Sequence, residues 1–159
     1  MIILKKMTQN EFDKFTEWSL KNYANELLES GMRIELTPYE EAKSQFKKIL
    51  PNGLKSKDNF LFVVQNEFYE DVGVIWYQIN PRNNEFGFIC ELFIYEQHRR
   101  KGYGTQVLTA IENDARTHGI KIMVLSVFKY NTPACELYYK SGYIKARELD
   151  KSMYLEKKL

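Results

Sequence analysis

The sequence is poor in the residues that metal centres and covalent catalysis use most. It has two cysteines and two histidines. Cys90 and Cys135 are far apart and show neither the spacing of a disulfide framework nor that of a zinc site, so reduced thiols are expected. Neither cysteine belongs to a His–acid pattern, and His98 and His118 are expected at the surface. We therefore predict no metal and no covalent cysteine intermediate.

Long apolar runs are missing as well. No run approaches the ~20 residues that a helix needs to cross a bilayer, and the first residues, Met-Ile-Ile-Leu-Lys-Lys, lack the apolar segment of a signal peptide. The net charge is +2, and the basic stretches are short, which argues against nucleic-acid binding. The sequence predicts a cytoplasmic protein with no membrane or nucleic-acid partner.

What the chain does have is the composition of an ordinary globular domain. Its 159 residues are 44% hydrophobic and 28% charged, which is enough for a substantial core. The 11 tyrosines and 10 phenylalanines suit a β-rich core. Without an internal repeat or linker, residues 1–159 are expected to form a single domain.

Apolar periodicity and turn signals predict a mixed α/β order. Thr8 or Asn10 can cap a first helix that Gly31 stops, and Thr37-Pro38 can open a second. Strands are predicted at 1–6, 59–66, 72–79, 88–95, 122–128, 143–147 and 152–156, with further helices at about 103–118 and 132–141. This order indicates an α/β layer around a mixed sheet.

The stretch from Cys90 to Ala115 combines a strand, a basic turn and an amphipathic helix. In the turn, residues 99–104 read Arg-Arg-Lys-Gly-Tyr-Gly. Glycines let backbone amides approach a ligand, and a helix beginning there directs unsatisfied N–H groups and its positive dipole end at the same point. Such a corner binds phosphate; a tight turn with three solvated cations is the alternative. The sequence contains no Walker A pattern, G-x-x-x-x-G-K-[ST]. The dinucleotide fingerprint G-x-G-x-x-G is also absent, because its third glycine would be at position 107, which is Val.

The helix after the turn has one apolar face. We expect its remaining acidic and basic residues to face water. The apolar face comprises Val107, Leu108, Ile111 and Ala115, and the residues expected in water are Glu112, Asp114 and Arg116.

Two motifs carry a resemblance to a known family. Arg99-x-x-Gly102-x-Gly104 resembles the [QR]-x-x-G-x-[GA] acyl-CoA loop of the GNAT N-acetyltransferase superfamily. Asn131-x-x-Ala134-x-x-Leu137-Tyr138-x-x-x-Gly142-Tyr143 resembles that family's second signature, with Tyr143 in place of the usual Phe. The resemblance spans roughly residues 58–157. It implies an α/β (α+β) GNAT fold, in which two parallel mid-sheet strands splay apart around acyl-CoA, and an acetyl-CoA-dependent N-acetyltransferase.

The resemblance also implies residues that bind the cosubstrate acetyl-CoA. Amides across 100–105 are expected to hold the pyrophosphate, and a strand edge to bond the pantetheine. Asn131 is expected to bond the pantetheine arm or to cap its helix, and both roles are open. The implied set is Leu92, Phe93, Ile94, Arg99, Arg100, Lys101, Gly102, Tyr103, Gly104, Thr105 and Asn131.

For the chemistry, the resemblance indicates Tyr138 as the general acid that protonates the departing thiolate, whose pKa is ~8.5. Packing on the sheet is its alternative role, and it is the expected role of Tyr139 and Tyr143. Glu91 is the candidate base, with a raised pKa expected in its apolar strand; a salt-bridged or sheet-edge carboxylate is the alternative. The oxyanion that forms during acetyl transfer is expected to accept a hydrogen bond from a strand N–H near Phe93.

The acceptor is open between a small amine, an antibiotic amine, and a protein N-terminus or lysine. A homodimer is a further expectation. A CoA-binding module without catalysis is the alternative function. Candidate lining residues, for which core packing is the other reading, are Trp18, Tyr23, Arg33, Trp76 and Tyr77. Acids that suit a cationic acceptor, or simply form a solvated helix face, are Glu26, Glu29 and Glu35.

Overall fold

The protein is represented by a computed structural model that describes residues 1–31 and 37–159. These residues form two compact units. One unit comprises Met1–Lys6 and Phe60–Leu159 and holds the sheet with helices α3 and α4, and the other comprises Met7–Asn59 and holds α1 and α2. Each unit has apolar residues that pack on one another within it.

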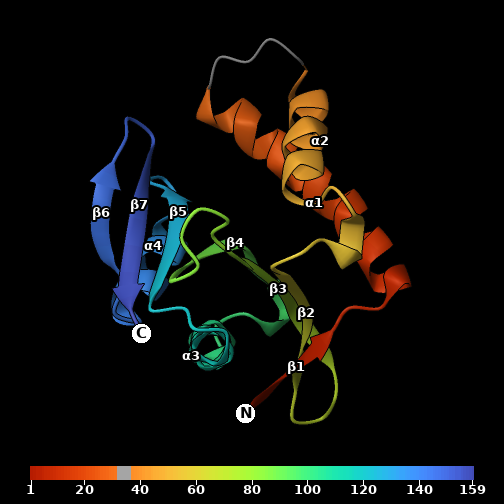
Figure 1. The fold of residues 1–159 in the computed structure, drawn as a ribbon, viewed down its shortest axis with the longest axis vertical. Coiled ribbons are helices and arrows are strands. Elements are labelled where there is room, and N and C mark those ends of the chain that lie inside the picture. Colours follow the sequence, from red (N-terminus) through yellow and green to blue (C-terminus); the bar gives the residue numbers. More distant parts are fainter. Residues whose placement is uncertain (32–36) are drawn as a thin grey trace. The chain divides into compact units, whose positions relative to one another are not determined.

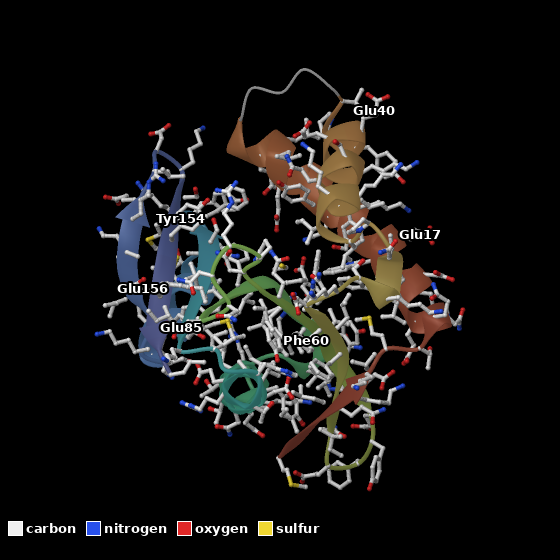
Figure 2. The ribbon with its side chains drawn as sticks, in the orientation of Figure 1. Glu17, Glu40, Phe60, Glu85, Tyr154 and Glu156 are labelled. Atoms are coloured by element: carbon white, nitrogen blue, oxygen red, sulfur yellow. The ribbon has the colours of Figure 1, made fainter. Side chains whose placement is uncertain are left out.

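The helical unit begins each of its long helices with a capping box. In α1 (Gln9–Ser30) the Thr8 hydroxyl accepts from the Glu11 N–H at 3.2 Å, and Glu11 accepts from the Thr8 N–H at 2.9 Å. In α2 (Pro38–Ile49) Thr37 and Glu40 repeat the arrangement, and Glu40 lies at the first turn of α2 in Figure 2. Of the two caps considered for the first helix, Thr8 and Asn10, the structure uses Thr8, and the predicted start of the second helix at Thr37 is confirmed.

The other unit contains a seven-stranded sheet with the order β1-β2-β3-β4-β5-β7-β6 (Figure 1). Among the strand pairings that the structure describes, β4–β5 is parallel, because α3 carries the chain back between them. The mixed sheet predicted from sequence is confirmed. The strands are β1 (Ile2–Lys6), β2 (Asn59–Asn66), β3 (Asp71–Ile79), β4 (Phe86–Ile94), β5 (Ile122–Phe128), β6 (Ile144–Glu148) and β7 (Ser152–Lys158).

The parallel strands β4 and β5 diverge half-way along their length. They pair from Phe86↔Ile122 to Ile89↔Leu125. Beyond that point β4 continues against β3, while β5 continues against β7. The divergence coincides with an extra residue, Cys90, in β4, because Trp76 of β3 is paired with Glu91 and the next β3 residue with Ile89. The splayed pair implied by the resemblance is therefore confirmed.

Helices α3 (Tyr103–Thr117) and α4 (Thr132–Lys140) cover one face of this sheet and share its core. The predicted apolar face of α3 is confirmed. The prediction that Glu112 faces water is wrong, since this residue is 4% exposed. Two 3₁₀ turns, Gly53–Lys55 and Glu96–His98, were not predicted. The core residues that α3 contributes are Val107, Leu108, Ile111 and Ala115.

Candidate active site

The basic turn between β4 and α3 leaves the start of the helix uncapped. Gly102 is the N-cap residue, with a left-handed φ of 81°, and no side chain accepts a cap hydrogen bond there. Arg100 is also left-handed, with φ 58°. The first-turn N–H groups of α3 therefore have no side-chain acceptor from the cap position, and alternating backbone handedness of this kind forms anion-binding concavities. The geometry suits a phosphate.

The three cations before Gly102 are not equivalent. The Nε of Arg99 donates to the Ile94 carbonyl at 2.8 Å, and its guanidinium carbon lies 5.0 Å from the centroid of the Phe93 ring. This holds the Arg99 side chain along β4 and engages one of the strand carbonyls expected to bond pantetheine. Arg99, Arg100 and Lys101 are all exposed, so solvent or a ligand can reach each of these three cations.

The two glycines of the turn serve different purposes. A Cβ on Gly102 would meet only Gln106 Nε2 at 3.9 Å, so Gly102 is required by its backbone conformation rather than by space. A Cβ on Gly104 would lie 3.0 Å from Leu137 Cδ2 of α4. Gly104 thus allows α3 to approach α4 closely. Sequence reasoning missed this contact, although both residues are fixed positions of the two motifs.

Asn131 caps α4. Its side-chain oxygen accepts from the Ala134 N–H at 3.3 Å, and Pro133 occupies the first turn. The capping role is therefore confirmed, while the bond to pantetheine remains a prediction. Asn131 itself is exposed.

Tyr138 of α4 is a buried residue. It is 9% exposed, and its ring contacts that of Tyr143 edge-on at 5.9 Å between centroids. Burial first, and then the charge of Glu91, raise the pKa of Tyr138 well above its usual range. The phenol therefore stays protonated at neutral pH, as a general acid must. The expectation that Tyr139 packs holds only in part, because this side chain is 47% exposed while its hydroxyl lies 3.5 Å from Met153 Sδ of β7.

The cysteines are poor nucleophiles. Burial raises the pKa of Cys90, with the charge of Glu91 adding to the effect, and burial likewise raises the pKa of Cys135. A thiol held in its protonated form reacts slowly. Over residues 1–31 and 37–159, no cluster of three His, Cys, Asp or Glu side chains suits a metal ion.

The aromatic residues considered for an acceptor site are mostly core residues. Trp76 and Tyr77 are buried, and the Tyr77 hydroxyl donates to Asp114 of α3 while its ring stacks on Phe60 at 4.9 Å (Phe60 is labelled in Figure 2). In the other unit, Tyr23 packs against the cluster of Leu20, Ala24 and Ala42. The ring centroids of Trp18 and Phe15 are 6.2 Å apart. Arg33, considered with them, lies outside the described residues.

The acids considered for binding a cationic acceptor differ in environment. Burial raises the pKa of Glu26, a hydrogen bond from Asn22 opposes the shift, and the charge of Glu29 adds to it. Glu29 is exposed. Glu35 lies outside the described residues. Glu26 is therefore not simply part of a solvated helix face.

Comparison with known proteins decides the family. The sequence model of the Acetyltransferase (GNAT) family matches residues 14–143. The chain belongs to this family. The GNAT resemblance of the two motifs is thereby confirmed. The uncharacterized N-acetyltransferase YdgE of Bacillus subtilis (strain 168) is 30% identical over 141 residues, which cover 88% of this chain and 90% of YdgE.

Solved structures agree with the GNAT fold. The crystal structure of the acetyltransferase-like protein YycN from Bacillus subtilis has a TM-score of 0.88 and 29% identity, and covers 100% of this chain and 99% of that one. A spermidine N-acetyltransferase from Vibrio cholerae, solved with CoA and spermine, has a TM-score of 0.68 and 15% identity. The match covers 99% of this chain and 95% of that one. The second likeness concerns the fold alone. In the part of the chain that the structure describes, no helix has the length and apolarity needed to span a bilayer.

Proposed function

We propose that this GNAT member transfers an acetyl group from acetyl-CoA to a primary amine by direct attack in a ternary complex. The observation that carries the proposal is the uncapped start of α3 at Gly102, which follows the half of β4 that β5 leaves unpaired. Main-chain N–H groups at a helix N-terminus bind a diphosphate well. In that half of β4, which includes Leu92 and Phe93, the strand pairs with β3 on one side; its edge toward β5 offers backbone groups to the pantetheine amides.

Tyr138 and Glu91 supply the proton transfers. The amine nitrogen attacks the thioester carbon, a C–N bond forms, and the C–S bond then breaks. Glu91, directly or through water, takes the proton that the amine must lose, and Tyr138 gives its proton to the departing sulfur. The products are an N-acetyl amide and CoA with a free thiol, and the proton on Glu91 then returns to the Tyr138 phenolate through water, which restores both groups. A strand N–H near Phe93 stabilises the oxyanion.

The two groups are electrostatically coupled in a useful direction. The negative charge of Glu91 contributes to raising the pKa of Tyr138. When Glu91 accepts a proton from the amine, that contribution disappears and the phenol becomes a stronger acid. Proton uptake by the base thus favours proton release by the acid at the step where the thiolate leaves.

The acceptor is a small amine or a peptide amine. We also expect a cytoplasmic location and a homodimer.

The proposal is tested by a screen of acetyl-CoA-dependent thiol release with polyamines, aminoglycosides, amino acids and short peptides. With an acceptor found, Tyr138→Phe is expected to lower kcat about 100-fold, in the range of general acid catalysis, and to leave acetyl-CoA affinity unchanged. Tyr139→Phe on the exposed face of α4 is the matched control and should keep wild-type kcat.

A second function, a CoA-binding module without catalysis, makes the opposite prediction. It is favoured if calorimetry shows acetyl-CoA binding while no amine in the screen releases thiol. A rate of Tyr138→Phe equal to that of wild type would instead move the acid role to another group.

A further inference from the structure

A buried polar network joins α3, the segment after α4, and β7. The Glu112 carboxylate, 4% exposed in the middle of α3, accepts from the Tyr143 hydroxyl at 3.1 Å and from Lys157 Nζ at 2.9 Å. Lys157 Nζ also lies 5.8 Å from the centroid of the Tyr143 ring. A buried carboxylate is unfavourable unless it is paired, and here both partners are supplied from distant parts of the chain.

This network explains the departure from the second family signature at position 143. A phenylalanine would fill the space of the ring but could not donate to Glu112. Burial, followed by the charge and hydrogen bond of Glu112 and then by Tyr138, raises the pKa of Tyr143 well above its usual range. The Tyr143 hydroxyl is therefore a permanent donor at neutral pH.

The network is directly connected to Tyr138. The Tyr143 N–H donates to the Tyr138 carbonyl at 3.0 Å, and the two rings meet edge-on at 65°. Between them in the chain, Gly142 has a φ of 94°, and a Cβ there would meet Lys157 Cε at 3.4 Å. The turn that ends α4 is therefore fixed by its own backbone bonds and by contact with β7.

Two contacts thus attach α4 and the segment that follows it to α3. Near the start of α3, Leu137 packs where Gly104 leaves room. Further along α3, Tyr143 bonds Glu112. Tyr138 follows Leu137 in the chain and packs on Tyr143, so both contacts constrain its position relative to the start of α3.

We infer that Tyr143, Glu112 and Lys157 position the Tyr138 hydroxyl relative to the N-terminus of α3, and so control acetyl transfer rather than acetyl-CoA binding. The inference rests on the proposed function. It makes Tyr143 and Glu112 positioning residues, because they act through Tyr138 and contact neither substrate. Their effect is expected in kcat, with KM for acetyl-CoA unchanged.

A double-mutant cycle tests the inference. Tyr143→Phe removes one hydroxyl and leaves Glu112 paired with Lys157, so the chain should fold. We expect kcat to fall about 10-fold with KM for acetyl-CoA within about 2-fold of wild type. In a Tyr138→Phe background the same change should have no further effect, because the group that it positions is absent. An equal loss of kcat in both backgrounds, or none in either, would overturn the inference. Tyr139→Phe is again the control.

A second measurement does not depend on turnover. Tyrosine labelled with ¹³C in the ring gives a Tyr138 signal that is assigned by its loss in Tyr138→Phe. With CoA bound, Tyr143→Phe is expected to shift this signal, and Glu112→Gln to shift it less because an amide oxygen still accepts from Tyr143. An unmoved Tyr138 signal in Tyr143→Phe would overturn the inference even if no acceptor amine is found, so failure of the proposed function is recognised separately.

Discussion

The N-termini of α1, α2 and α4 are closed by side chains of the protein, whereas that of α3 is left open. Thr8, Thr37 and Asn131 each accept a hydrogen bond from the first turn that they precede. Gly102 has no side chain with which to do so. The open end is also the one that follows the point where β4 and β5 stop pairing.

The difference separates structural requirements from functional ones. A side-chain cap stabilises a helix by about 1 kcal/mol. The start of α3 lacks this stabilisation, which α1, α2 and α4 have. Free N–H groups gain more when a charged ligand supplies the acceptor, because hydrogen bonds to ions are stronger than those to neutral groups. We therefore interpret the N-terminus of α3 as a cap completed by acetyl-CoA.

The largest expected effect comes from closing the open end with a negative charge. Gly102→Glu is expected to lower acetyl-CoA affinity at least ~100-fold, because its carboxylate repels the pyrophosphate at the N–H groups that would bind it. Calorimetric titration with acetyl-CoA measures this.

Gly119→Glu is the matched control for this change. Gly119 has a φ of 82°, close to the 81° of Gly102, and a Cβ there meets nothing within 4 Å. Both variants carry the same added charge and the same left-handed penalty, about 1–2 kcal/mol. Equal acetyl-CoA affinities in the two variants would refute the assignment of the loop.

Gly104→Ala should have a smaller effect that falls on stability first. The new Cβ would lie 3.0 Å from Leu137 Cδ2, and overpacking of this kind costs about 1–3 kcal/mol. Denaturant unfolding measures the loss. In a Leu137→Ala background the same glycine change should cost less, because the shorter side chain leaves room for the new Cβ. If Gly104→Ala lowers the stability equally in both backgrounds, the close approach of α3 to α4 is not the reason for this glycine.

The local elements of the fold were predictable because their signals lie within a few residues. Thr8 with Glu11, Pro38 after Thr37, and Gly119 after α3 mark helix ends by chemistry that needs no tertiary context. The order of strands in the sheet and the extra residue at Cys90 depend on pairing between distant segments. Such pairing leaves no local signal.

The candidate site was predictable in part for the same reason. The glycine turn and Tyr138 belong to short motifs that resemblance can identify. The burial of Glu112 could not be predicted, since its partners Tyr143 and Lys157 follow it by 31 and 45 residues. The position of Arg99 along β4 likewise depends on the Phe93 ring and the Ile94 carbonyl.

The smallest expected effect concerns Asn131, which has a cap function and a predicted bond to pantetheine. Asn131→Ala should lower stability by about 1 kcal/mol, as should Thr8→Ala, because each loses a cap. Only Asn131→Ala should also weaken acetyl-CoA binding, by about 5-fold for one neutral hydrogen bond. Asn131→Ser separates the two functions, since a hydroxyl can still cap α4 but cannot replace the amide. Serine should restore the stability measured in denaturant while acetyl-CoA affinity stays low. Recovery of both the stability and the acetyl-CoA affinity would show that Asn131 acts only as a helix cap. The N-terminus of α4 would then resemble that of α1, where the side chain of Thr8 is the cap.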